Sequence, residues 1–378
     1  MATKTKSANS ATKTLDADNM KVPMVETGCL PFDLAMTNGK GLPLGSSILL
    51  YAMPGVGKTT LFADVTRNLL RKAKEKDIPF KVLFVDVEGS TELLVSMGLK
   101  PYIVSGDIII KTGQITFGEL SNMYEKVLAW HEGVDSRKLD EEYKDVKLII
   151  VDSLCQVQSQ ALLDKDVDDG DFGSNAKERA RFYPKFLGRC KTAGVTSMFI
   201  TQVRVKQGAQ AFEDPKRPAC TDTDIHNCEI CCKLSKGANA TVAGKKEVKT
   251  TFGVKQLSSR GIINIKTSGT GNVKNRFCTI PDIECLIEYG KGVINSYTVK
   301  EMLMNLGYIK LSGSRYCFGD EIVAAMGWTD VEPNVGIEKV PFNQRISANT
   351  SELVGFLKSK DSFLVLPENS VDYGDGLT

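Results

Sequence analysis

The chain has 378 residues, of which 48 are basic and 46 acidic, so its net charge is +2. This length suggests one large domain with one or two smaller ones, and the near balance of charge means that any nucleic-acid surface must be a local patch. No run approaches the roughly 18 apolar residues of a membrane span, and the N-terminus lacks an apolar segment. We therefore expect a cytoplasmic protein that does not contact a membrane.

The first elements in chain order are a polar arm and a strand. Residues 1–21 are rich in Ala, Lys, Ser, Thr and Asn without periodic apolar positions, so we expect a flexible arm. From Val22 the composition changes, and the apolar run over 47–51 predicts a buried strand. Helical spacing follows from Leu61 onward, which leaves 52–60 as the connection between strand and helix.

This connection, Ala-Met-Pro-Gly-Val-Gly-Lys-Thr-Thr, is typical of a loop that binds a triphosphate. Its glycines let backbone N–H groups surround an anion at the positive end of a helix. Lys58 would direct its charge at the outer phosphates of ATP, and Thr59 would place its hydroxyl on Mg²⁺. A plain glycine-rich turn is the alternative, because the usual pattern begins with Gly and this chain has Ala52. The expected nucleotide contacts are Pro54, Gly55, Val56, Gly57, Lys58, Thr59 and Thr60.

Further apolar runs at 82–87, 107–111, 148–151 and 195–201 alternate with helical segments. This alternation predicts an α/β fold with a mostly parallel sheet covered by helices on both faces. In the helix expected at 117–132, one face is apolar. That face carries Phe117, Leu120, Tyr124, Val127 and Leu128. Ligands on such sheets bind at the carboxyl ends of the strands, so the chemistry should come from the residues that follow the apolar runs.

Three polar side chains follow these runs. Asp152 would hold the water shell of the Mg²⁺ bound by Thr59, although an Asp that merely begins a loop is the alternative. Glu88 would orient and deprotonate the water that attacks ATP, with Asp86 as a competitor further from the strand tip. Gln202 offers a neutral amide that can contact the γ-phosphate and report its loss to the segment that follows.

The segment after Gln202 is basic and supplies the residue types that grip single-stranded nucleic acid. Arg204 and Lys206 would contact phosphates, and Phe212 would stack or wedge between bases. An earlier loop at 164–173 is acidic but ends in Phe172, and positive charge returns directly after it. We assign Phe172, Lys177 and Arg179 to DNA contact, with a solvated helix face as the alternative for the two cations.

Short strand pairs over 248–289 predict an antiparallel extension of the sheet. A helix at 298–306, a hairpin at 308–318 and a helix at 321–326 then predict a small C-terminal domain. We divide the chain into an arm (1–21), an ATPase core with DNA-binding loops (22–295), a small C-terminal domain (296–365) and a disordered tail (366–378).

The chain has ten cysteines, and several lie in or beside apolar runs, where a reduced thiol acts as a small hydrophobic side chain. One group could instead suggest zinc, because it contains a Cys-x-x-Cys spacing. It consists of Cys220, His226, Cys228, Cys231 and Cys232. A single such pair without a second is a weak signal, so we expect core residues here.

Taken together, these motifs resemble the RecA family of DNA strand-exchange ATPases. The likeness extends over about 22–320 and includes further segments outside the sites above. The resembling segments are Thr27-Gly28, Gly41-Leu42-Pro43-Leu44-Gly45, Val85-Asp86-Val87-Glu88, Val151-Asp152-Ser153, Thr201-Gln202-Val203-Arg204-Val205-Lys206, Val273-Lys274-Asn275-Arg276 and Tyr289-Gly290-Lys291-Gly292. The resemblance implies a RecA-type P-loop ATPase core with an antiparallel extension and a small C-terminal α+β domain. It also implies that Lys274 and Arg276 reach the ATP of a neighbouring protomer.

The chain departs from the family pattern in several places. Arg276 stands where the family has a lysine, which replaces a point charge by a planar fork. The family's paired glycines are missing from 216–224, the segment 233–271 is longer than expected, and an N-terminal docking helix is replaced by the polar arm. These differences favour a divergent bacteriophage (UvsX-like) member of the family.

The implied function is DNA recombination and repair. The expected protein is a DNA-dependent ATPase that forms a helical filament on single-stranded DNA and pairs it with homologous double-stranded DNA. ATP and Mg²⁺ would bind between protomers of this homo-oligomer. Two alternatives are a RecA-fold ring ATPase that remodels or loads protein partners, and a DNA-coating protein for which ATP is a clamp with little turnover.

Overall fold

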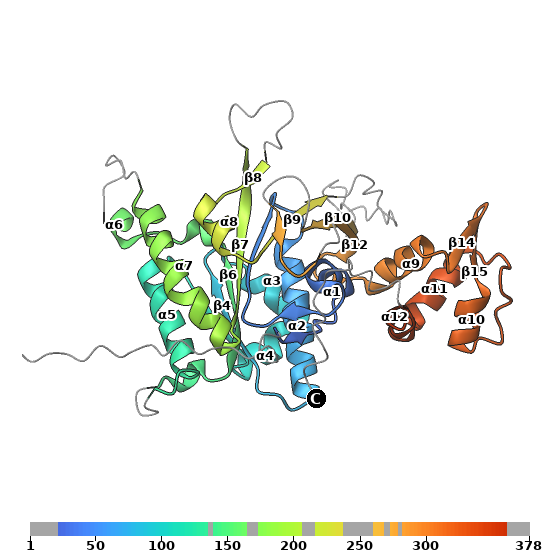
Figure 1. Cartoon of the computed structure of the whole chain (residues 1–378), viewed down its shortest axis with the longest axis horizontal. Helices are drawn as coiled ribbons and strands as arrows, with labels where there is room; N and C mark the ends of the chain where they lie inside the picture. The colour runs from blue at the N-terminus through green and yellow to red at the C-terminus, as the bar shows by residue number, and fades with distance from the viewer. Residues whose placement is uncertain are drawn as a thin grey trace, which may run out of the picture.

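The computed structural model of the chain describes residues 22–134, 139–164, 173–205, 216–236, 260–267, 273–278 and 282–360. In this part of the chain, one large sheet has the strand order β13-β12-β10-β9-β3-β7-β6-β4-β5, with β11 beside β9 and β8 beside β7 (Figure 1). Its strands are β3 (Ser47–Ala52), β4 (Lys81–Asp86), β5 (Ile108–Thr112), β6 (Val146–Asp152), β7 (Thr196–Val205), β8 (Lys216–Pro218), β9 (Ile230–Lys236), β10 (Arg260–Lys266), β11 (Lys274–Asn275), β12 (Asp282–Glu288) and β13 (Gly292–Val293).

The strands from β9 to β5 in this order are parallel, and β10, β12 and β13 extend the sheet in antiparallel fashion. The predicted α/β class with an antiparallel extension is therefore confirmed. A second, two-stranded sheet joins β1 (Met24–Val25) to β2 (Leu42–Pro43). Both faces of the parallel part are buried, which explains why its strands are continuous apolar runs rather than alternating ones.

Helices cover both faces of the large sheet (Figure 1). One face packs against α1 (Leu30–Thr37), α2 (Lys58–Glu75), α3 (Thr91–Leu94), the π-helical turn η2 (Val95–Leu99) and α4 (Lys100–Val104). The other packs against α5 (Phe117–Ala129) and α7 (Ser174–Ala193). Neighbours on β3 illustrate the division, since Leu50 enters the first core and Leu49 the second. The predicted apolar face of α5 is buried as expected.

Shorter elements connect these layers. They are the 3-10 turns η4 (Glu141–Tyr143) and η5 (Leu154–Gln156) and the helices α6 (Gln160–Leu163) and α8 (Asp222–Asn227). One expectation needs correction here, because the strand predicted to end at Thr201 continues to Val205 as β7 and pairs with β8. The first part of the basic segment after Gln202 is thus a β-ribbon rather than a loop.

The C-terminal part contains the expected hairpin of β14 (Ile309–Ser312) and β15 (Arg315–Phe318). Around it lie α9 (Asn295–Asn305), α10 (Asp320–Met326), α11 (Lys339–Ala348) and α12 (Thr350–Lys358), of which the last two were not predicted (Figure 1). Their apolar residues form a separate core with Phe318 and Phe342 near its centre. Leu30 and Leu34 of α1 enter this core, so the C-terminal part packs directly on the part of the chain that contains the large sheet.

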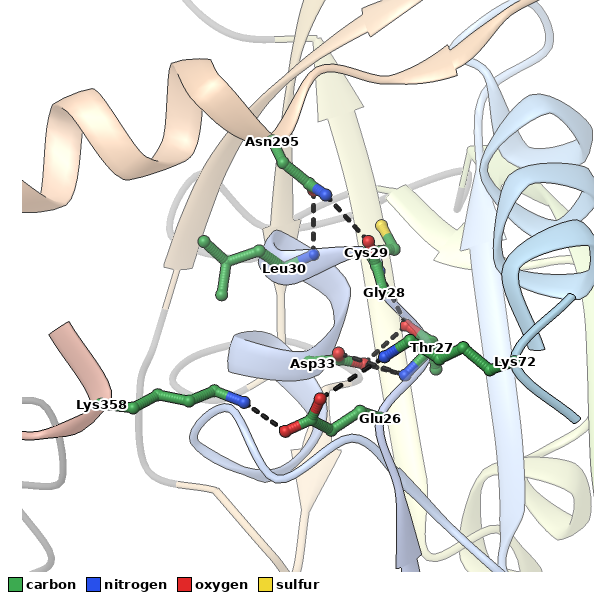
Figure 2. A network of polar contacts seen from close by, with 9 residues as sticks. All are labelled: Glu26, Thr27, Gly28, Cys29, Leu30, Asp33, Lys72, Asn295 and Lys358. Carbon is green, nitrogen blue, oxygen red and sulfur yellow. Dashed lines mark hydrogen bonds and ion pairs between the residues drawn. The ribbon is translucent and has the colours of Figure 1, made fainter. Parts of the chain in front are cut away.

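Polar contacts reinforce this junction (Figure 2). Asn295 accepts a hydrogen bond from Leu30 N at 3.0 Å and donates one to Gly28 O at 2.8 Å. Glu26 pairs with Lys358 of α12 and lies 3.4 Å from the amine of Lys72 on α2. The segment before α1 therefore contacts both the C-terminal helices and α2, the helix that starts at the expected phosphate loop.

Beside this junction, the buried carboxylate of Asp33 accepts hydrogen bonds from Thr27, whose hydroxyl lies 2.6 Å from Oδ1 (Figure 2). Burial raises the pKa of Asp33 to about 7, against the lowering effect of the Thr27 bonds. Elsewhere, none of the described helices is long and apolar enough to cross a membrane. The expected arm (1–21) and the whole of the expected tail (366–378) lie outside the described residues.

Candidate active site and nucleic-acid interface

The segment between β3 and α2 has the backbone of an anion-binding loop. Gly55 and Gly57 have φ angles of +72° and +107°, which non-glycine residues rarely adopt. A Cβ on Gly57 would also lie 3.3 Å from Ile287, so the loop is held closely against β12. Gly57 caps α2, and the first amides of this 18-residue helix face the loop region with the positive end of its dipole.

Lys58 is the first residue of α2 and is only 8% exposed. Its Nζ donates to the carbonyl of Ala52, the last residue of β3, at 3.3 Å and to that of Met53, the first residue of the loop, at 3.4 Å. Burial lowers the pKa of Lys58, while the nearby carboxylates of Glu88 and Asp152 oppose this shift. The amine therefore already lies where a phosphate oxygen could replace the two carbonyl contacts.

Asp152 ends β6 and is fully buried beside the loop. The hydroxyl of Thr59 donates to its Oδ2 at 3.2 Å, while Oδ1 is buried without a hydrogen-bond partner among the described residues. Burial, with a smaller contribution from the charge of Glu88, raises the pKa of Asp152 to about 7. A buried carboxylate oxygen without a partner, next to a threonine hydroxyl, is an oxygen donor set that fits Mg²⁺ and its waters.

Glu88 lies at the same edge of the sheet. Its backbone N–H donates to Asp152 O at 3.2 Å, and its exposed side chain accepts from Gln202 Nε2 at 3.0 Å. The competing carboxylate, Asp86, is buried and accepts from Ser90 and Thr91, so it is occupied in holding the start of α3. Of the two, Glu88 is the one whose carboxylate reaches the open edge where a water could be activated.

The sheet register explains this convergence. Ala52 pairs with Gln202 across β3 and β7, and Asp86 pairs with Asp152 across β4 and β6. The loop after β3, Glu88, Asp152 and Gln202 therefore leave the same edge of adjacent strands, as expected from their positions after the apolar runs. The order of these strands, β3-β7-β6-β4, places Gln202 and Asp152 between the phosphate loop and Glu88.

Lys274 and Arg276 lie elsewhere in the chain. On β11, Lys274 pairs with Cys231 and Asn275 with Ile230, and Ile230 in turn is level with Ile48 at the start of β3. These cations are thus about four residues, roughly 13 Å, from the strand end that carries the phosphate loop. Lys274 Nζ donates to the carbonyls of Ile225 at 3.4 Å and His226 at 3.0 Å, and the side chain of Arg276 is 61% exposed. Within one chain they do not join the site.

Of the expected DNA contacts, two are exposed, three lie outside the described residues and one is buried. Arg204 is exposed on β7, two residues beyond Gln202, and pairs in register with Arg217 of β8. Lys177 is exposed in the first turn of α7. Phe172, Lys206 and Phe212 lie outside the described residues.

Arg179 is the exception. Its side chain is 5% exposed and donates to Asp224 Oδ2 at 2.9 Å and to Leu154 O at 3.3 Å, with its guanidinium over the ring of Phe117. Asp224 also accepts from Tyr183 and from the backbone and hydroxyl groups of Thr221. A guanidinium buried in this network does not face the solvent, which argues against the expected contact of Arg179 with a DNA phosphate.

Two residues near the site were not anticipated in these roles. Gln156, in η5, donates from Nε2 to Glu88 Oε1 at 3.3 Å, and no spacing in the sequence indicated this contact. Tyr289 places its hydroxyl 3.4 Å from Gly55 O and its ring beside Gly57. Its segment Tyr289-Gly290-Lys291-Gly292 resembles the family pattern, but no spacing in the sequence indicates its contact with the phosphate loop.

The cysteine group forms no metal centre among the described residues, where no cluster of three or more potential ligands occurs. Cys228, Cys231 and Cys232 are buried, and burial raises the pKa of each thiol. Cys231 Sγ donates to Ile225 O at 3.5 Å. These residues pack in the cores on the two faces of β9.

Comparison with known proteins places this geometry in context. No protein-family model matches the chain. Protein RecA of Nitratidesulfovibrio vulgaris (strain DP4) is 24% identical over 350 residues, or 92% of this chain and 86% of that protein. Protein RecA of Marinobacter nauticus is 26% identical over 317 residues, or 81% of this chain and 77% of that protein. Protein RecA of Bifidobacterium longum is 26% identical over 323 residues, or 83% of this chain and 69% of that protein.

The similarity is low in identity but extends over most of the chain in each case. It coincides with a parallel sheet whose adjacent strand ends carry a phosphate loop, two carboxylates and an amide. Over most of its length, the chain is therefore similar to proteins named RecA from three bacteria, at 24–26% identity.

Proposed function

We propose that this protein is an ATP- and Mg²⁺-dependent recombinase that forms a helical filament on single-stranded DNA. The filament would pair with homologous duplex DNA and exchange strands with it. The observation that carries the proposal is the contact between Glu88 and Gln202, because β7 continues from Gln202 directly to the exposed Arg204. The expected base of ATP hydrolysis is thereby linked to the candidate DNA grip over two residues.

The nucleotide would bind with its phosphates over the loop and the first amides of α2. Lys58 would exchange its two carbonyl contacts for phosphate oxygens, which neutralises charge at the outer phosphates. Thr59 and Asp152 are the residues that would hold Mg²⁺, whose role when bound is to neutralise charge on the phosphates. In the described part of the chain, Oδ1 of Asp152 is buried without a hydrogen-bond partner, which supports this assignment.

Hydrolysis requires a group that positions a water in line with the γ-phosphorus and accepts its proton. Glu88 would take that proton as the water oxygen bonds to phosphorus and the bond to the ADP oxygen breaks. Gln202 would then contact Glu88 or the γ-phosphate depending on the nucleotide, and any shift would be transmitted to Arg204 along the same strand. Arg204 and Arg217 are paired in register, so β7 and β8 bring two cationic residue types together where DNA phosphates would be contacted.

Lys274 and Arg276 would complete the site from a neighbouring protomer. Their distance along β9 and β3 from their own phosphate loop supports a contact across an interface, which a filament with ATP between protomers would provide.

The test is the rate of ATP hydrolysis with and without single-stranded DNA, followed by strand exchange between a circular single strand and a homologous linear duplex. We expect DNA to stimulate hydrolysis and ATP to support exchange. Hydrolysis that DNA leaves unchanged would indicate the protein-remodelling ATPase instead. DNA binding without turnover would indicate the DNA-coating protein.

A further inference from the structure

Two amides, not one, hold the carboxylate of Glu88. Gln202 Nε2 lies 3.0 Å and Gln156 Nε2 lies 3.3 Å from the same atom, Oε1. Among the described residues, no hydrogen bond reaches Oε2 of this side chain. The two donors come from different strand ends, Gln202 from β7 and Gln156 from the 3-10 turn that follows β6. A carboxylate oxygen can accept two such bonds, and together they leave the second oxygen free for a water.

Two hydrogen-bond donors restrict the orientation of the Glu88 carboxylate more than one donor does. A carboxylate anchored at a single point can still turn about that hydrogen bond, whereas donors from two directions limit its orientation. Misplacement of a catalytic group by about 1 Å can cost on the order of 100-fold in rate. If Gln202 turns toward a bound γ-phosphate, Gln156 is the donor that still holds Oε1.

The backbone of Gln156 is itself held in place. Its N–H donates to Ser153 O at 3.1 Å within η5, and Arg179 donates to Leu154 O at 3.3 Å in the same turn. Arg179 belongs to α7 and pairs with Asp224 of α8. The turn η5 is therefore connected to α7, which follows the expected DNA loop at 164–173, and to α8, which follows the basic segment after Gln202. These hydrogen bonds fix the backbone of the turn and so keep the side chain of Gln156 within reach of Glu88.

We propose that Gln156 is a positioning residue for ATP hydrolysis. It holds the carboxylate of Glu88 from the turn after β6, as Gln202 holds it from β7. This inference rests on the proposed role of Glu88 as the base. It predicts that the hydrolytic step depends on Gln156 while nucleotide and DNA binding do not.

The test is the variant Gln156→Leu, which keeps the side chain's size and removes its donor. We expect kcat to fall about tenfold, since a hydrogen bond to a charged group contributes roughly 1.5 kcal/mol or more. The KM for ATP should stay within about twofold of wild type, and so should the affinity for single-stranded DNA measured with a non-hydrolysable ATP analogue. The melting temperature should stay within about one degree of wild type. The matched control is Gln160→Leu, because Gln160 is exposed four residues further on and donates to Asp164 at 2.8 Å instead.

A double-mutant cycle separates positioning from a general structural effect. In Glu88→Asp, whose shorter side chain withdraws the carboxylate from Gln156, adding Gln156→Leu should lower kcat by less than about twofold. Wild-type kcat in Gln156→Leu, or a tenfold loss in both backgrounds, would overturn the proposal. All rates are measured with and without DNA. If DNA does not change the wild-type rate of hydrolysis, the recombinase function is contradicted. The ratio of variant to wild-type kcat without DNA still tests the role of Gln156 in that case.

Discussion

Gln202 donates to Oε1 of Glu88 at 3.0 Å, although 114 residues separate them in the chain. The contact follows from the sheet register, because β6 pairs with both β4 and β7 and so brings the two strand ends together. Gln202 is followed on the same strand by Arg204, whose side chain is exposed. We therefore expect an anion bound at Arg204 to alter the position of the Gln202 amide, because the two residues are separated by one residue on the same strand.

The first prediction concerns Glu88 itself. Replacing it by Gln keeps the size and a hydrogen-bonding group but removes the proton acceptor, so kcat for ATP should fall by about 100-fold or more. The affinity for ATP should change little, because binding depends on the phosphate loop. Single-turnover hydrolysis and equilibrium binding of a fluorescent ATP analogue check the two quantities. A variant that retains wild-type turnover would remove Glu88 from the mechanism.

Arg204→Ala should weaken binding to single-stranded DNA and make it less sensitive to salt. Each lost phosphate contact lowers the slope of log affinity against log salt by roughly 0.7, since fewer counterions are released. Lys76→Ala is the matched control, because Lys76 is exposed at the far end of the 18-residue α2, about 27 Å from the phosphate loop. Anisotropy titrations at four salt concentrations measure the slope. Equal slopes for Arg204→Ala and wild type would place the DNA site elsewhere.

Arg179 and Lys177 should respond in opposite ways. Arg179→Met leaves the buried carboxylate of Asp224 without its cation, so we expect a loss of about 3–5 kcal/mol in the free energy of unfolding. Lys177→Ala removes an exposed side chain, so stability should hold while DNA affinity falls. Denaturant unfolding and DNA titration on both variants decide the matter. If Arg179→Met is stable and binds DNA weakly, Arg179 belongs to the interface after all.

Much of this arrangement could be predicted from the sequence, because apolar runs with polar ends define strands and the edge at which ligands bind. The phosphate loop, Asp152, Glu88 and Gln202 meet for that reason. The buried position of Arg179 was also encoded, since it shares helical spacing with the buried Phe182, Tyr183 and Phe186 of α7. Positive charge alone was the basis for assigning Arg179 to DNA. The alternation of Val203, Arg204 and Val205 likewise indicated that β7 continues.

Other features have no local signal. Gln156 contacts Glu88 only because a 3-10 turn directs its side chain back toward β4, and the direction of an irregular turn depends on tertiary contacts such as Arg179 with Leu154 O. The occupation of Asp86 by Ser90 and Thr91 depends in the same way on how the chain turns after β4. Sequence spacing favoured Glu88 over Asp86 as the base but could not show which groups hold Asp86.

Asp33 should make stability depend on pH. Burial raises its pKa to about 7 in the folded protein, from 3.8 in its unperturbed state. The folded state therefore keeps a proton that the unfolded state has lost, and this contribution to stability is full below about pH 4 and lost as pH rises to about 7. In Asp33→Asn the group does not titrate, so the stability of the variant relative to wild type should rise over this window, by on the order of 4 kcal/mol.

Unfolding midpoints of both proteins at pH 5, 6, 7 and 8 test this difference. The charges of Glu26 and Lys72 act on Asp33, and both side chains are present in both proteins. A difference between Asp33→Asn and wild type that is constant from pH 5 to pH 8 would mean that the carboxylate is ionised throughout, held by the bonds from Thr27.

The last prediction concerns the site shared between protomers. Lys58→Ala and Arg276→Ala should each abolish most hydrolysis when alone, but an equal mixture should regain activity. In a mixed filament, about one interface in four would join an intact phosphate loop to an intact Arg276. If both side chains acted on a nucleotide within one chain, no mixture could restore the pair. We therefore measure ATP hydrolysis in the mixture and in each variant alone. Hydrolysis that appears only in the mixture and rises with total protein concentration identifies a site built from two chains.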